Sequence, residues 1–197
     1  MFLFIAIPLI IFIVMLTAYF MYYSRIKDAR KYHKEINEKA LSILKEVKFD
    51  NSKTFYLNDY VSYALTYEFK QQIFADVTKN ALCFIDYKKG NITVVGFDEI
   101  LNYEIYENGS TTTSGLGFGG ICAALFSTET TGLCKELKLI IRLKRYDVPQ
   151  ITYTIIENTY LNIGANKTST LYRQCISSLQ EIVSFLQVII DNNSKKH

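Results

Sequence analysis

The first 23 residues limit what this chain can form more than any other feature, because none of them carries a charged side chain. As an α-helix this run would be about 35 Å long, which exceeds the hydrocarbon core of a bilayer, about 30 Å thick. No basic residue precedes the run, and it ends in bulky side chains rather than in the small residues of a signal-peptide cleavage site. The sequence therefore predicts a retained transmembrane helix over residues 1–23.

The residues that flank this run predict its orientation. Tyr19, Tyr22 and Tyr23 stand where aromatic side chains usually mark a membrane interface. Basic residues close to a membrane segment are retained on the cytoplasmic side. We therefore expect a single-pass plasma-membrane protein in contact with the lipid bilayer, with its N-terminus outside and its C-terminal domain in the cytoplasm. The basic residues predicted to lie at the interface are Arg25, Lys27, Arg30, Lys31 and Lys34.

Residues 24–50 predict a basic, amphipathic juxtamembrane helix. Apolar side chains recur from Ile26 to Val47 with a spacing of three and four residues, which places them on one stripe of a helix. The stripe also contains His33 and alanines, so it is weak for a coiled coil, which favours large apolar residues along its seam. Three arrangements stay open: packing on the following domain, a weak parallel homodimer through residues 24–48, or a solvated helix.

Residues 51–191 predict one α+β domain, followed by a disordered tail over residues 192–197. Two strand-like runs flank a turn that contains Lys89 and Gly90, which is typical of a β-hairpin. After further strands, Ser169 is placed to cap an amphipathic helix whose stripe includes Leu179 and Ile182. We expect an antiparallel split barrel or sandwich that this helix covers. The predicted strands are 81–87, 92–97, 101–107, 136–146 and 150–157, and the helix is 169–191.

Part of this domain resembles a known family. The segments CFIDYKKGNITVVGFDEILNYEIYENG and CKELKLIIRLKRY enclose a glycine-rich stretch and precede a strand and a helix. This order is similar to the bacterial pleckstrin-homology-like (PH-like) domains of uncharacterised proteins, over roughly residues 75–190. The resemblance implies a PH-type split barrel, and it supplies no catalytic or ligand-binding residues. The step that carries it is Phe97, Asp98, Ile100, Tyr103 and Glu104.

Reactive residue types are scattered along the chain. The four cysteines are Cys83, Cys122, Cys134 and Cys175, with no closely spaced pair, and the histidines are His33 and His197. This pattern does not predict a zinc site or a nucleophile paired with a base. Residues 115–120 match G-x-G-x-x-G but lack the βαβ context that nucleotide binding requires. The net charge of +3 does not favour nucleic-acid binding. We therefore expect a non-enzymatic protein without cofactor or metal.

Two surfaces could contact a partner. A basic patch could form from Lys88, Lys89, Lys138, Arg142, Lys144 and Arg145, although such residues also occur on any solvated strand face. The other surface is the glycine-rich loop over residues 110–132, which is a functional contact, a packing element or a disordered loop. We expect a membrane-anchored interaction module for an unknown protein; the alternative is a peripheral sensor of anionic lipid that uses the basic linker and patch. The candidate loop contacts are Gly115, Gly117, Phe118, Gly120, Ile121, Leu125 and Phe126.

Overall fold

The computed structural model describes residues 2–50, 53–61, 69–87, 89–108, 110–113, 132–157 and 164–195. The chain divides into two compact units, residues 1–43 and residues 44–197. The first unit is most of one long helix, and the second contains all the described strands and the remaining described helices.

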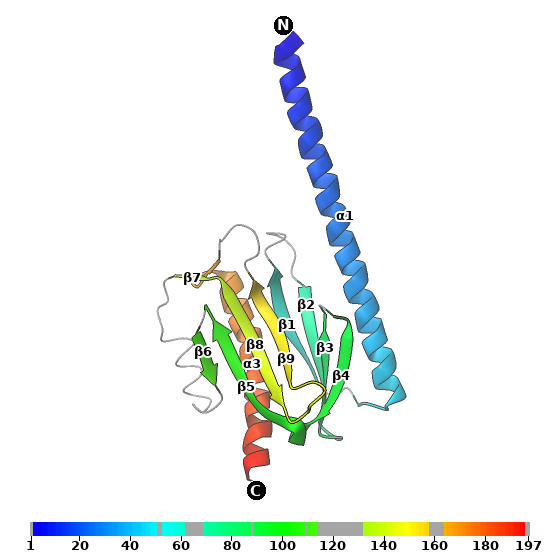
Figure 1. Ribbon diagram of the computed structural model, residues 1–197, viewed down its shortest axis with the longest axis vertical. Coiled ribbons are helices and arrows are strands. Elements are labelled where there is room, and N and C mark those ends of the chain that lie inside the picture. Colours follow the sequence, from blue (N-terminus) through cyan, green and yellow to red (C-terminus); the bar gives the residue numbers. More distant parts are fainter. Residues whose placement is uncertain are drawn as a thin grey trace. The chain divides into compact units, whose positions relative to one another are not determined.

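Helix α1 (Phe2–Glu46) is a single unbroken helix of 45 residues (Figure 1). The helix predicted over residues 24–50 is therefore its second half, and no helix begins at Ser24. Exposed pairs between Lys31 and Glu35 (3.8 Å) and between Lys34 and Glu38 (3.7 Å) follow the i,i+4 spacing of a helix surface. A homodimer through this helix stays a prediction.

The predicted transmembrane helix is wrong. Crossing a bilayer takes about 20 consecutive, predominantly apolar residues. Among the residues that the structure describes, no helix reaches the combination of length and apolar character that a membrane span needs. This finding also removes the predicted single-pass, plasma-membrane placement with the N-terminus outside and the domain in the cytoplasm.

The end of α1 is fixed by local hydrogen bonds. Lys48 adopts a positive φ of 51°, and the N–H of Phe49 donates to the carbonyl of Leu44 (2.8 Å), which is how helices commonly end. The buried carboxylate of Asp76 then accepts the N–H of Asp50 (2.7 Å) and that of Lys79 (2.9 Å). Asp76 therefore ties the segment after α1 to the turn that follows the second strand.

The second unit is built on an eight-stranded sheet with the order β4-β3-β2-β1-β9-β8-β5-β6. All neighbouring strands are antiparallel except β1 and β9, which are parallel. A separate two-stranded sheet pairs β7 with β10. The strands are β1 (Lys53–Val61), β2 (Phe69–Asp76), β3 (Ala81–Asp86), β4 (Asn91–Gly96), β5 (Ile100–Glu107), β6 (Ser110–Thr113), β7 (Leu133–Cys134), β8 (Glu136–Leu143), β9 (Gln150–Glu157) and β10 (Ala165–Asn166).

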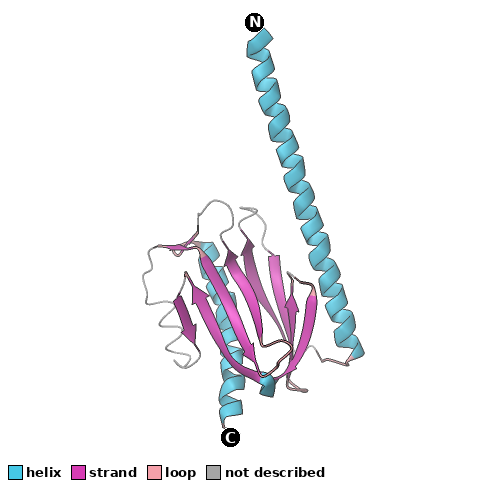
Figure 2. Ribbon diagram, in the orientation of Figure 1, coloured by secondary structure: helices cyan, strands magenta, loops and turns pink. Residues whose placement is uncertain are grey.

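One long helix covers one face of this sheet (Figure 2). Helix α3 (Thr170–Ser194) is capped by Ser169, whose hydroxyl accepts the N–H of Tyr172 (3.2 Å), and a short 3-10 helix, η1 (Phe97–Glu99), links β4 to β5. The predicted cap is thus confirmed, as is the α+β class. The sequence predicts that the disordered tail begins at residue 192, but α3 continues to Ser194. In this last turn the Asn193 amide donates to the carbonyl of Phe97 (2.7 Å).

The hydrophobic core lies between α3 and the sheet. Side chains alternate along β8, so that Leu137, Leu139, Ile141 and Leu143 are buried while the residues between them are more exposed. Leu179 and Ile182 on α3 are fully buried, as their spacing predicted. The largest fully buried side chains of the core are Tyr103, Tyr153, Phe55, Phe84, Leu57 and Ile73.

Truncating one core residue of α3 should cost far more stability than truncating an exposed one. Leu179→Ala removes a fully buried side chain, and such changes lower the free energy of unfolding by about 2–5 kcal/mol. Val188→Ala on the same helix is the matched control, because Val188 is 57% exposed. Equal unfolding free energies for the two variants, measured by denaturant titration, would contradict this packing.

Candidate functional site

The eight-stranded sheet is held together at its centre by very few backbone pairs. Among the described residues, strands β1 and β9 pair only at Tyr60 with Ile156 and at Val61 with Glu157. The other described residues of β1 pair with β2, and those of β9 pair with β8. We call this incomplete junction between the β1–β4 half and the β9–β8–β5–β6 half the seam.

Side chains bridge the seam where the backbones do not. The N–H of Ile85 on β3 donates to the hydroxyl oxygen of Tyr153 on β9 (2.9 Å), and the Gln71 amide on β2 donates to the carbonyl of Thr154 (3.0 Å). Tyr153 is almost fully buried, and this burial raises the pKa of its hydroxyl well above the usual value. Since burial favours the neutral phenol, the hydroxyl stays available as a hydrogen-bonding group.

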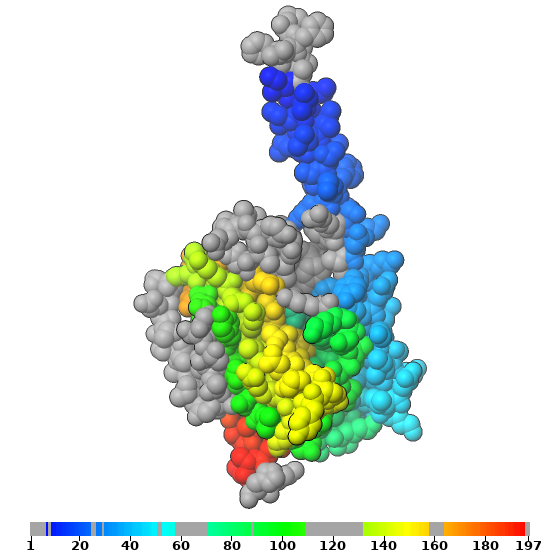
Figure 3. Space-filling view, in the orientation of Figure 1, coloured from blue at the N-terminus to red at the C-terminus, as the bar shows by residue number. Residues whose placement is uncertain are grey.

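A cleft of about 570 Å³ opens over this seam. It lies between the β3–β4 turn and the β8–β9 turn, whose surfaces adjoin in Figure 3. Phe84, Val148 and Ile151 contribute apolar lining, and short polar side chains provide most of the rest. The polar and charged residues of the cleft are Asp86, Lys89, Asn91, Thr93, Lys138, Asp147, Gln150, Thr152 and Thr154.

Three of the six cations of the predicted basic patch are paired with carboxylates. Lys138 forms an ion pair with Glu136 and lies over the ring of Tyr106. Arg142 Nε donates to Glu104 (2.9 Å), and this pairing raises the pKa of the guanidinium. These pairs leave little free positive charge on the outer face of β8.

The remaining cations of the patch belong to the turns. Arg145 Nη2 donates to Asp147 (2.7 Å), and its Nη1 donates to the carbonyl of Val94 on β4 (3.2 Å). Within the described residues, Lys89 and Lys144 show no ion pair, and Lys88 lies outside them. Ion pairing therefore reduces the positive charge of the patch without removing it.

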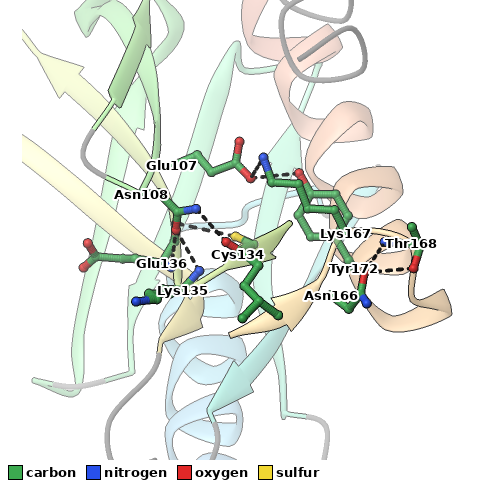
Figure 4. A network of polar contacts seen from close by, with 10 residues as sticks. Glu107, Asn108, Cys134, Lys135, Glu136, Asn166, Lys167, Thr168 and Tyr172 are labelled. Carbon is green, nitrogen blue, oxygen red and sulfur yellow. Dashed lines mark hydrogen bonds and ion pairs between the residues drawn. The ribbon is translucent and has the colours of Figure 1, made fainter. Parts of the chain in front are cut away.

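A second polar cluster connects the end of β5 with β7 and the start of α3 (Figure 4). The Glu107 carboxylate at the end of β5 accepts the hydroxyl of Tyr172 (3.0 Å) and pairs with Lys167 (3.0 Å). The Asn108 side chain accepts the N–H of Lys135 (2.7 Å) and donates to the carbonyl of Leu133 (2.8 Å). These contacts connect β5, β7 and the start of α3.

This cluster holds the chain on both sides of residues 114–131. Ser110 pairs with Glu107 in the β5–β6 ladder, and the carbonyl of Gly132 accepts the N–H of Lys167 (3.1 Å). Cys134 lies beside Glu107, and burial together with this carboxylate raises the pKa of the Cys134 thiol to about 12. The thiol is therefore protonated and poorly suited to nucleophilic chemistry, so the cluster has a structural role.

The loop and α1 residues predicted from the sequence as partner or membrane contacts are not those that form the seam and the cleft among the described residues. Gly115, Gly117, Phe118, Gly120, Ile121, Leu125 and Phe126 lie outside the described residues. Tyr19, Tyr22, Tyr23, Lys27, Arg30, Lys31 and Lys34 are exposed on α1, and the side chain of Arg25 is not among those described. The assignment of these α1 residues to a membrane interface has lost its basis with the transmembrane helix.

The residues that form the seam were not predicted from the sequence. Tyr153 appeared only as one member of an alternating strand, and Gln71 lies in a stretch without a clear pattern. One signal was present: a tyrosine on the buried side of a strand usually needs a hydrogen-bond partner. That signal indicates a partner without saying which strand supplies it.

No family model, no curated protein and no solved structure matches this chain. The resemblance to PH-like domains therefore rests on the sequence pattern alone and stays a prediction. In the described part of the chain, no cluster of three or more His, Cys, Asp or Glu side chains could hold a metal ion.

Removing the Tyr153 hydroxyl should weaken the seam. Tyr153→Phe leaves the N–H of Ile85 without its partner in a buried position, which costs about 1–3 kcal/mol of unfolding free energy. Tyr146→Phe is the matched control, because Tyr146 is fully exposed. If denaturant titration shows the two variants to be equally stable, the tyrosine does not bridge the seam as described.

The buried thiols should resist alkylation in the folded protein. Burial raises the pKa of Cys83, like that of Cys134, to about 12. Since only the thiolate reacts, iodoacetamide at a pH of about 8 should leave both residues unmodified until denaturant is added. Mass spectrometry of the proteolytic peptides measures this. Modification of either cysteine at the rate of a free thiol would show that it is accessible.

Proposed function

We propose that residues 44–197 form a non-enzymatic interaction module that binds a protein partner at the cleft over the seam. The observation that carries this proposal is the cleft itself, which has about 570 Å³ of space between two turns and a lining of short polar side chains. Volumes of about 300–1,000 Å³ are typical of pockets that bind small ligands. The described lining of the cleft provides hydrogen-bonding groups.

The chemistry of the described residues supports binding rather than catalysis. Cys83, Cys134 and Cys175 are buried, and none of the three lines the cleft. The lining also lacks a histidine, a serine and a tyrosine among its described residues. Asp147 at the rim is paired with Arg145, which lowers the pKa of its carboxyl and keeps it ionised at neutral pH. An ionised, paired carboxylate is a weak proton donor.

Both turns that border the cleft are held firmly. In the β3–β4 turn, the N–H of Gly90 donates to the carbonyl of Asp86 (2.7 Å), and Gly90 has the positive φ of 70° that glycine tolerates best. In the β8–β9 turn, the N–H of Leu143 donates to the carbonyl of Pro149 (2.9 Å). Arg145 ties this turn to β4 through Val94. A partner would thus meet a preorganised site, which lowers the entropic cost of binding.

The alternative, a peripheral sensor of anionic lipid, has weaker support. Attraction to anionic headgroups depends on free positive charge, at about 1 kcal/mol per basic residue near the surface. On the domain, Lys138, Arg142 and Arg145 are each paired with a carboxylate. Binding of the full chain to vesicles of anionic lipid that falls steeply with salt would favour this alternative over the first proposal.

A photo-crosslinking amino acid at the cleft should capture the partner in the native cell. Placed at Lys89 in the lining, it should give a covalent adduct with another protein; placed at the exposed Val188 of α3, it should not. Both positions are exposed, so they differ in location rather than in access. Gel mobility and mass spectrometry of the full chain measure the outcome. The absence of adducts at Lys89, or the same adducts at both positions, would contradict the proposed function.

A further inference from the structure

Strand β9 carries an unused hydrogen-bonding edge inside the cleft. The N–H of Leu143 donates to the carbonyl of Pro149, so the β8–β9 pairs at steps of two from this one are the hydrogen-bonded pairs. These are Ile141 with Ile151 and Leu139 with Tyr153. The backbone groups of the residues between them therefore point away from β8. Those residues are Gln150, Thr152 and Thr154.

An independent contact confirms this direction. The carbonyl of Thr154 accepts the Gln71 side chain from β2, across the seam and away from β8. Thr152 lies two residues earlier on the same edge, so its backbone N–H and carbonyl face the same way. Within the described residues, neither a ladder bond nor a side chain reaches them, because β1 pairs with β9 only at Ile156 and Glu157.

The cleft provides the space that this edge faces. Gln150 and Thr152 are exposed, and both line it. The outer edge of β4, in the β1–β4 half of the sheet, differs from this edge. There, Arg145 donates to the carbonyl of Val94 and so covers it. Unpaired backbone groups on a strand edge recruit another strand unless they are covered. At Thr152 the edge is uncovered among the described residues, and it faces a preformed cleft.

We propose that the occupant of the cleft is an extended peptide segment of the partner protein, which adds as a strand along β9 at Gln150–Thr152. This inference rests on the function proposed above and specifies its mode. A peptide backbone supplies both a donor and an acceptor to each unused group, and it does so at the spacing of a strand. Alternate side chains of the peptide would face the polar lining of the cleft.

Charge at the cleft favours recognition of the backbone. Lys138 is paired with Glu136, and Arg145 with Asp147. Lys89 and Asp86 bring opposite charges to the same turn. Because these charges offset one another, binding should depend only weakly on ionic strength, in contrast to binding of an anionic surface.

The test uses the full chain and peptides selected against it from a phage-displayed library of random linear peptides. Thr152→Pro removes the N–H that faces the cleft and no bond of the β8 ladder, and proline is tolerated at such edge positions. Thr152→Ala keeps the N–H and is the matched control. Both variants lose the threonine side chain, so the comparison between them isolates the N–H: fluorescence titration should show binding at least about tenfold weaker for Thr152→Pro than for Thr152→Ala.

Hydrogen exchange provides a second measurement that needs no variant. In the free wild-type chain, the amide of Thr152 should exchange much faster than those of Ile151 and Tyr153, and a saturating selected peptide should protect it. This decides the question if Thr152→Pro does not fold. The proposal is overturned if the Thr152 amide is already protected in the free chain, if the peptide leaves it unprotected, or if no peptide is enriched.

The outcomes also separate this mode of binding from the function. Crosslinking from Lys89 that captures a partner equally well in the wild-type and Thr152→Pro chains would leave the interaction module standing and rule out strand addition. No capture from Lys89, with fast exchange of the Thr152 amide and a peptide that protects it, would support the binding mode while removing the evidence for a cellular partner.

Discussion

The junction between β1 and β9, which has two backbone pairs among the described residues, is the constraint on which the rest of this domain depends. In a sheet whose other neighbours are antiparallel, this parallel contact joins a four-stranded meander to the remaining strands. Backbone pairing over so short a length cannot fix the relation of the two halves. Tyr153 and Gln71 do so instead, by satisfying backbone groups that would otherwise be buried without a partner. The reach of these two side chains sets how far β9 stands from β2 and β3.

Helix α3 fastens the same two halves from the opposite face. Its Phe185 ring contacts Phe55 of β1 (5.0 Å between centroids) and Phe97 of η1 (5.8 Å). Its Gln187 accepts the hydroxyl of Tyr103 on β5 (2.9 Å), so the helix contacts strands on both sides of the seam. Lys138 and Thr152 alternate with the buried Leu139 and Tyr153, so the cleft they line opens away from α3. Apolar side chains fill the face of the seam that α3 covers. Polar side chains bridge the seam itself, and the cleft opens on the opposite face.

Local elements could be predicted from the sequence because their signals are local. The hairpin around Gly90, the alternation along β8 and the Ser169 cap each appear within a few residues, and the structure confirms them. The seam could not be predicted, because Tyr153 and Ile85 meet only after strands far apart in the chain are arranged. The apolar N-terminal run predicted a membrane span, whereas the described residues contain no helix that qualifies and α1 instead continues unbroken to Glu46.

The basic patch shows why charge read along one strand misleads. In the sequence, Lys138, Arg142 and Lys144 stand out as cations on the exposed side of a strand. The pairing of Arg142 depends on a neighbouring strand: Glu104 projects from β5, and the strand register brings it there. Lys138 pairs with Glu136 of its own strand, and no ion pair with Lys144 occurs among the described residues. Pairing of this kind adds little stability when it is exposed, but it removes the field that would attract an anionic surface. The described lining of the cleft is mostly polar: side-chain hydroxyls and amides, the opposite charges of Asp86 and Lys89, and the backbone edge of β9. Selectivity at such a site comes from shape and hydrogen-bond geometry, which suits a segment that presents its own backbone.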